Sequence, residues 1–204
     1  MDEKQLLSSL IIMAEDTVDF LTQARKWERE CWVCSEFVKA LDVNVSPNDL
    51  VKPSSEPPDV IVNGANFEVY IVMERYRRLN ADWKNKVLKY RNAQVLQELL
   101  QPYSPPQKIS AEQILEFLMP TLLNKHHKYS KRQVPLGEID VLAYVNLENF
   151  ILDLETTFPL PFEFQKQGWR SVSIFGNSYC RVLYAGESAP DFLCLHADKT
   201  IRTT

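Results

Sequence analysis

The chain has 204 residues, of which 45% are hydrophobic and 25% charged, and it contains only five glycines. This composition excludes disordered and low-complexity proteins, and it suffices for a single domain with a sizeable core. The formal net charge of −4 conceals two strongly basic segments in an otherwise acidic chain.

The chain begins with a segment of helical periodicity from Asp2 to about Leu21, which we expect to dock on the domain as a helix. Its apolar stretch, Leu6 to Ala14, is too short to span a membrane. Acidic residues flank that stretch where a signal peptide would have basic ones. We therefore expect a soluble, cytoplasmic protein that does not enter a membrane.

A second helix is predicted from about Ala24 to Leu41, because apolar residues recur along it at helical spacing. Cys31 and Cys34 lie on this apolar face, so core packing is the favoured interpretation of the CxxC pattern. Two alternatives remain open. One is a redox-active thiol pair, and the other is a zinc site completed by Cys180, Cys194 and His196.

The most informative stretch is a predicted hairpin from Asp59 to Met73. Two β-branched, apolar runs flank Asn63-Gly64, the dipeptide that best tolerates the positive φ angles of a type I′ turn. A two-residue loop then fixes the register of the two strands. The expected pairs are Val62 with Ala65, Ile61 with Asn66, Val60 with Phe67, and Asp59 with Glu68.

This register brings two carboxylates, Asp59 and Glu68, together at the end of an apolar hairpin. Directly opposed side chains have Cβ atoms roughly 5 Å apart, and like charges there are destabilising unless something offsets them. Mg²⁺ binds one or two such carboxylates and keeps several waters. The alternatives are a solvated sheet end, a protonated acid, or an acid paired with an arginine.

Pro58-Asp59 followed by Glu68-Val69-Tyr70 resembles the PD-(D/E)xK signature of the restriction endonuclease-like nuclease superfamily. More closely, residues 24–91 resemble a small bacterial family of uncharacterised proteins described as "putative endonucleases". The shared features are the run from Arg25 through Trp27-Glu28-Arg29-Glu30-Cys31-Trp32, the Pro-Pro-Asp segment and the Phe-Glu-Val segment.

The resemblance implies an α/β fold with a restriction endonuclease-like three-layer core, a central mixed β-sheet and an N-terminal helical extension. It also implies that Asp59 and Glu68 hold one or two Mg²⁺ ions, for which Mn²⁺ can substitute. The superfamily often supplies a third acidic ligand from a helix before the hairpin, and Glu36 is the candidate here, with a solvated helical glutamate as the alternative.

The chain departs from the signature at its lysine, where Tyr70 stands. By the period-two rule Tyr70 shares the face of Glu68 and points into the predicted site. A phenol, with an ordinary pKa of about 10, carries no positive charge to offset a phosphate. Some members of the superfamily recruit a lysine from another element instead.

Two segments after the hairpin are basic. Residues 74–94 have a net charge of +5, and residues 121–134, which include His126-His127, have a net charge of +4. Such segments can bind phosphates, although exposed helix faces are often equally basic. The candidate phosphate contacts are Arg75, Arg77, Arg78 and Lys84.

The remaining elements are helices and strands. Residues 74–100 read as one long helix or two, and a capping box of Ser110 and Gln113 starts another helix that reaches Leu123. Strands are expected around 137–144, 171–175 and 179–184, and a strand or short helix over 149–155. The 204 residues are predicted to form one domain with N-terminal helices (1–42), a core hairpin (58–73), a basic helical segment (74–134) and further strands (138–184).

A rival carboxylate pair, Asp140 and Asp153, also resembles a branch of the same superfamily, with Glu155 in place of the lysine. We rank it second, because the long helix expected after the hairpin follows Met73 and not Glu155. The sequence therefore predicts a metal-dependent endonuclease using Asp59, Glu68 and Tyr70. The alternative is an inactive nuclease-fold protein that binds nucleic acid or another protein. The oligomeric state is not predicted.

Overall fold

The computed structural model describes residues 2–100, 102, 104–153, 158 and 162–202. The chain forms two compact units, each built from two separate stretches. Unit 1 comprises Met1–Arg29 and Arg75–Pro105, and unit 2 comprises Glu30–Glu74 and Pro106–Thr204. No helix among the described residues is long and apolar enough to cross a membrane.

Unit 1 is a pair of helices, α1 (Glu3–Phe20) and α3 (Leu79–Asn92), with short 3₁₀ turns at Gln23–Arg25 and Leu96–Leu99. Asp2 and Gln5 form a capping box that starts α1, as the periodicity from Asp2 to Leu21 predicted. Arg91 of α3 pairs with Glu15 of α1 at 2.6 Å. The predicted helix at Glu74 begins later, at Leu79, because the preceding Arg78 is extended.

Unit 2 contains a six-stranded mixed sheet in the order β1-β2-β4-β6-β7-β8. Its strands are β1 (Val60–Val62), β2 (Ala65–Val72), β4 (Asp140–Val145), β6 (Ser171–Gly176), β7 (Tyr179–Ala185) and β8 (Thr200–Arg202). β2, β4 and β6 run parallel, whereas the β1–β2, β6–β7 and β7–β8 pairs are antiparallel. The prediction of an α/β fold with a central mixed sheet is therefore confirmed.

The predicted hairpin register is confirmed where the ladder forms. Val60 pairs with Phe67, Ile61 with Asn66 and Val62 with Ala65. Asn63 and Gly64 have φ angles of 47° and 79°, which only a turn of the I′ kind requires at both positions. The second predicted hairpin, β6–β7, also forms, and β8 adds an edge strand that the sequence pattern did not reveal.

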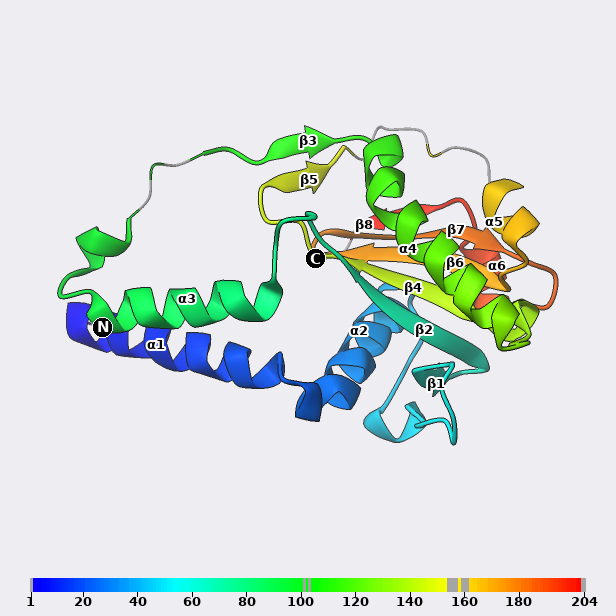
Figure 1. Ribbon diagram of the computed structural model, residues 1–204, viewed down its shortest axis with the longest axis horizontal. Coiled ribbons are helices and arrows are strands. Elements are labelled where there is room, and N and C mark those ends of the chain that lie inside the picture. The colour runs from blue at the N-terminus through cyan, green and yellow to red at the C-terminus, as the bar shows by residue number, and fades with distance from the viewer. Residues whose placement is uncertain (1, 101, 103, 154–157, 159–161, 203–204) are drawn as a thin grey trace. The chain divides into compact units, whose positions relative to one another are not determined.

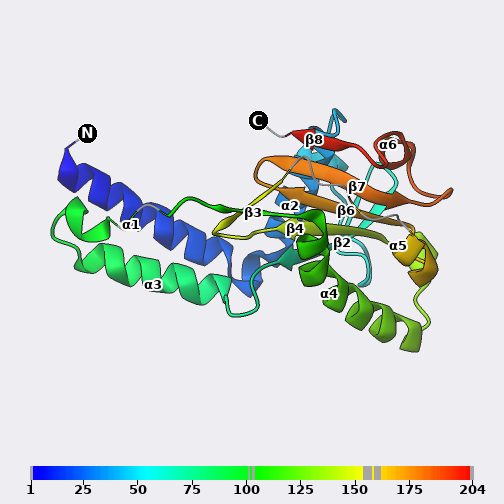
Figure 2. The ribbon, with the colours of Figure 1, turned by 90° about the horizontal axis from the view of Figure 1, so that it is seen from above.

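Helices cover both faces of this sheet (Figures 1 and 2). α2 (Lys26–Ala40) packs on one face, where the Phe37 ring meets Phe67 at 5.8 Å and Phe175 at 6.4 Å between ring centroids. α4 (Ala111–Lys131) covers the other face and shares a core with Tyr70 and Val141. Alternation along β2 thus points Phe67 toward α2, and Glu68 and Tyr70 toward α4.

α4 begins at the predicted capping box of Ser110 and Gln113 but ends at Lys131, well beyond the expected Leu123. The helix continues through Pro120, which lacks the N–H for one intrahelical hydrogen bond. Buried Leu118, Leu122 and Tyr129 extend one apolar face along it, so tertiary packing stabilises the longer helix. The basic segment 121–134 therefore belongs largely to a helix that packs on the sheet.

The remaining elements of unit 2 are short. A second sheet pairs β3 (Gln107–Ile109) with β5 (Phe150–Leu152), and the further helical pieces are Pro47–Asp49, Leu136–Glu138, α5 (Phe162–Gln167) and α6 (Asp191–Leu195). The predicted strand or helix at 149–155 is thus a strand, although Glu155 lies outside the described residues.

Candidate active site

Two side chains of α4 meet at the buried carboxylate of Glu68 on β2, whose side chain is 4% exposed. The Lys125 ammonium of α4 donates to Glu68 Oε1 at 2.8 Å. One helical turn further, the Tyr129 hydroxyl donates to the same oxygen at 2.5 Å. Because residues four apart share a helix face, α4 presents a cation and a hydroxyl to one acceptor.

Lys125 also lies over the residue that replaces the signature lysine. Its Nζ is 5.0 Å from the centroid of the Tyr70 ring and 5.4 Å from that of Tyr129, both within cation–π range. The Tyr70 hydroxyl is buried, and it makes no hydrogen bond of normal geometry with the described residues. A lysine from α4 therefore occupies the neighbourhood where β2 itself supplies none.

Asp59 lies beside this cluster, but not in the expected direct pair with Glu68. Its N–H donates to the carbonyl of Phe67 at 2.8 Å, although Phe67 already pairs with Val60. Two residues thus face one, as in a β-bulge. The Asp59 carboxylate accepts a hydrogen bond from the Val69 N–H at 3.0 Å, so the Asp59 side chain is bonded to the backbone of β2.

The carboxylates of Asp59 and Glu68 both raise the pKa of two nearby phenols, those of Tyr70 and Tyr129. Burial raises the pKa of Tyr70, and the negative charges of Glu68 and Asp59 raise it further. Burial also raises the pKa of Tyr129, with its hydrogen bond to Glu68 as the next cause. Both hydroxyls are consequently protonated at neutral pH.

Glu36 is not brought to this cluster. It lies on α2, which covers the opposite face of the sheet, and it pairs with Lys39 at 2.9 Å. Among the described residues no group of three or more His, Cys, Asp or Glu side chains is arranged to hold a metal ion. Any divalent cation at Asp59 and Glu68 would therefore complete its shell with water or phosphate oxygens.

Each member of the rival pair has contacts of its own. Asp140, which is fully buried, accepts hydrogen bonds from Arg170, from Ser171 Oγ at 2.7 Å and from the Asn66 N–H at 2.8 Å. Arg170 also donates to the Gly64 carbonyl at 3.0 Å. These contacts tie the hairpin turn to β4 and occupy the carboxylate. Asp153 directly follows β5, and its Oδ1 atom lies 3.9 Å from Lys108 Nζ.

The cysteines fit a packing role. Burial raises the pKa of the Cys31 thiol to about 11 and raises that of Cys34 as well, which is the opposite of a reactive thiol. All four cysteines are free, and they form no metal group within the described part of the chain. The core interpretation of the CxxC therefore agrees with the structure better than the redox or zinc alternatives.

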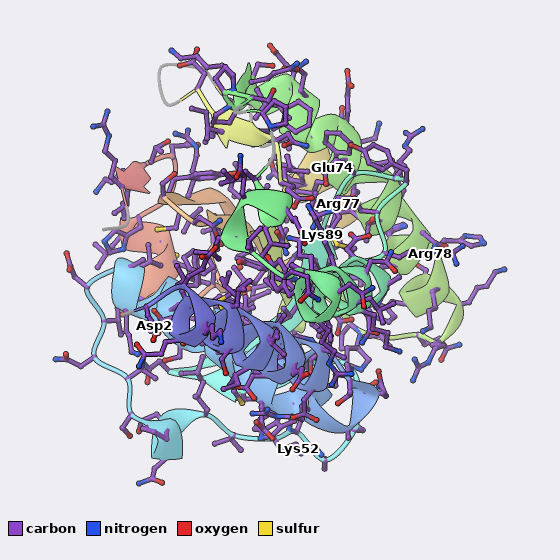
Figure 3. The ribbon with its side chains drawn as sticks, turned by 90° about the vertical axis from the view of Figure 1, so that its left-hand side faces the viewer. Asp2, Lys52, Glu74, Arg77, Arg78 and Lys89 are labelled. Atoms are coloured by element: carbon purple, nitrogen blue, oxygen red, sulfur yellow. The ribbon has the colours of Figure 1, made fainter. Side chains whose placement is uncertain are left out.

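The basic residues proposed as phosphate contacts lie in unit 1. Arg77 and Arg78 immediately precede α3 and are labelled in Figure 3. Arg77 forms an ion pair with Asp82 at 3.3 Å. Arg75 lies just before them, and Lys84 is within α3. The second basic segment is in unit 2, on the same helix as Lys125.

Lys125 and Tyr129 are the functional candidates that the sequence analysis missed. A signal was present, because Leu118, Leu122, Lys125 and Tyr129 follow one another at spacings of four, three and four residues. A lysine within an apolar helical stripe needs a buried acceptor. Ending the helix at Leu123 placed both residues on a generic basic surface and hid this signal.

One solved structure resembles the whole chain. It is a protein of unknown function from Pseudomonas aeruginosa strain PAO1, described as belonging to a "Monooxygenase Superfamily". The identity is 38% and the TM-score 0.73, and the match covers 100% of this chain and 97% of that one. No curated protein matches the chain. A family model matches residues 2–204, so the chain belongs to the family described as "Putative endonuclease, protein of unknown function (DUF1780)".

Proposed function

We propose that this protein is a metal-dependent endonuclease that hydrolyses nucleic-acid phosphodiesters at the cluster of Asp59, Glu68 and Lys125. The observation that carries the proposal is the position of Lys125, whose ammonium contacts Glu68 and covers the ring of Tyr70. A lysine from α4 would thereby replace the one that the PD-(D/E)xK signature places at Tyr70. The family description supports the nuclease assignment at a coarse level.

The fold is compatible with this assignment. The β1–β2 hairpin begins a mixed sheet, β2 lies parallel to β4, and helices cover both faces. We infer that this arrangement is a restriction endonuclease-like core, with Asp59 at the start of the hairpin and Glu68 within β2.

Asp59 and Glu68 fit a Mg²⁺ or Mn²⁺ ion, since two carboxylates with several waters satisfy such a cation. The buried hydroxyl of Tyr70, which makes no hydrogen bond of normal geometry with the described residues, would be available to donate to a water or phosphate oxygen of a loaded site. A bound ion would supply an acidified water and stabilise charge on the leaving oxygen. Arg75, Arg77, Arg78 and Lys84 remain predictions from the sequence, whereas Glu36 lies on the α2 face and is not part of this site.

The chain's own residues would prepare the site in two ways. Lys125 and Tyr129 neutralise and orient Glu68, which a buried carboxylate requires. With Glu68 holding a cation, the Lys125 ammonium would be available to an attacking or phosphate oxygen. Its contact with the Tyr70 ring would hold it in place at that stage.

The test is calorimetric titration of Mg²⁺ and Mn²⁺ into the wild type and into Asp59→Asn and Glu68→Gln, followed by cleavage assays on DNA and RNA. Both variants are expected to lose metal binding and cleavage, while Asp153→Asn, at the rival position, retains them. Lys125→Met should retain metal binding but lose cleavage. Loss of metal binding in Asp153→Asn alone would move the site to the rival pair.

A second candidate function is a nucleic-acid or protein binding module that does not cleave. It is favoured by the occupied state of Glu68, which already has two close donors. Asp59→Ala separates the two functions, because it abolishes cleavage in an enzyme and leaves a binding module intact. Wild type that binds an oligonucleotide equally with Mg²⁺ and with EDTA, and cleaves nothing, would establish the second function.

A further inference from the structure

A pocket of about 640 Å³ lies in unit 2 on the sheet face opposite Glu68, between α2 and the turn that joins β6 to β7. Its size is within the range of small-molecule sites. All of its lining residues belong to unit 2, and none belongs to the proposed nuclease cluster. The pocket includes Glu36 and Trp32, which the sequence analysis selected and the proposed active site does not use.

The apolar wall of the pocket is a corner of aromatic rings. Trp32 and Tyr144 meet edge to face, with ring centroids 5.5 Å apart and planes at 89°. The Phe175 ring, which also lines the pocket, has its centroid 5.7 Å from that of Tyr144. Trp32 remains 43% exposed, although indole is usually well buried. A third flat ring entering this corner would stack on one ring and meet the other at its edge.

Polar groups surround this corner. Asn177 accepts a hydrogen bond from the Tyr144 hydroxyl at 3.1 Å through its Oδ1 atom, so its amide N–H groups remain available as donors. Glu36 uses Oε1 for its ion pair with Lys39, and its second oxygen can accept from a ligand. Arg202, on β8, adds a cation at the rim.

We propose that this pocket binds a nucleobase that carries an exocyclic amino group, with its phosphate toward Arg202. The base would stack in the Trp32–Tyr144 corner, receive hydrogen bonds from the Asn177 amide, and donate from its amino group to Glu36. A carboxylate acceptor discriminates amino-bearing bases from uracil and thymine. The base can come from a free nucleotide or from an unpaired position in a strand, since both offer the same ring and phosphate.

The proposal is independent of the nuclease cluster. The aromatic corner and its polar rim lie on the α2 face of the sheet, whereas Glu68 and Lys125 lie on the α4 face. Base binding in this pocket requires no metal ion. It can therefore be measured in EDTA, under conditions in which the proposed active site is not loaded.

The experiment is a calorimetric titration of AMP, CMP and UMP, with ribose 5-phosphate as the baseless probe, all in EDTA. AMP and CMP should bind, UMP more weakly and ribose 5-phosphate not measurably. Because base stacking contributes roughly 5- to 150-fold to affinity, Trp32→Leu should weaken AMP binding by at least about fivefold. Trp83→Leu, on α3, is the matched control and should bind as the wild type does.

Two further variants locate the contacts. Glu36→Gln should reduce the preference for CMP over UMP, and Asp59→Asn should leave every affinity unchanged, whatever it does to cleavage. Affinity for a short single-stranded oligonucleotide that greatly exceeds that for AMP, and that Trp32→Leu reduces as it reduces AMP binding, would identify a strand as the source of the base. Comparable affinities would identify the free nucleotide. Equal binding of AMP by Trp32→Leu and the wild type, or equal binding of AMP and ribose 5-phosphate, would overturn the proposal.

Discussion

Replacing Lys125 by Met tests the central electrostatic contact of the candidate site. Glu68 is 4% exposed and receives Lys125 Nζ at 2.8 Å, so removal of the ammonium leaves a buried carboxylate with the Tyr129 hydroxyl as its remaining donor from α4. Breaking a buried ion pair typically costs about 3–5 kcal/mol. Lys125 is 29% exposed and Tyr129 stays, so we expect a loss near the lower limit, about 3 kcal/mol.

Urea denaturation followed by circular dichroism measures this loss. With an m-value of about 2 kcal/mol per molar, the midpoint should fall by about 1.5 M. Lys128→Met is the matched control, because Lys128 lies on the same helix but is exposed. Its free energy of unfolding should change by less than about 0.5 kcal/mol.

Metal ions add a second part to this prediction. In Lys125→Met a divalent cation would replace the missing positive charge, and at about 100 times its Kd it would restore about 2.7 kcal/mol. In the wild type the same ion must first displace the ammonium from Glu68, so Mg²⁺ should stabilise the variant more than the wild type. A midpoint of Lys125→Met equal to that of the wild type in EDTA would refute the reasoning, because Glu68 would then need no cation.

Three further outcomes are expected. Arg170→Met leaves the fully buried Asp140 without its cation and should cost about 3–5 kcal/mol in urea unfolding, whereas the same change in an Asp140→Leu background should cost much less. Gly64→Ala should cost about 1 kcal/mol, because φ is 79° there although no atom lies near the added Cβ; an unchanged midpoint would contradict the turn assignment. The pKa of Cys31 is raised to about 11, so its alkylation at pH 8, measured by mass spectrometry, should be much slower than that of exposed Cys194 and should accelerate only as the pH approaches 11. Equal rates at pH 8 would contradict the raised pKa of Cys31.

The family of this chain is described as an endonuclease family, whereas the similar solved structure is described as belonging to a monooxygenase superfamily. Because these descriptions differ, the choice of function depends on the side chains. Asp59, Glu68 and Lys125 are the residues of the proposed phosphodiester hydrolysis, and the Trp32 pocket lies on the other face of the sheet. The metal titrations and the EDTA titrations examine these two faces separately. Each proposal can therefore fail without the other.

Local patterns in the sequence determined much of the fold. Asn63-Gly64 fixed a hairpin and its register, since few residues tolerate a positive φ at both positions of the turn. The Ser110 and Gln113 capping box located the start of α4, because it satisfies backbone N–H groups that are exposed at a helix terminus. The hairpin also placed Glu68 and Tyr70 on one face, which period-two alternation alone requires.

Only the tertiary structure decided which residues meet Glu68. Lys125 and Tyr129 are 57 and 61 residues away in the chain, and packing against the sheet extends their helix past the point where local signals stop. The same packing placed Glu36 on the opposite face and enclosed Asp140 with Arg170. Local propensity sets turns and caps, whereas the partner of a buried charge depends on how distant elements pack together.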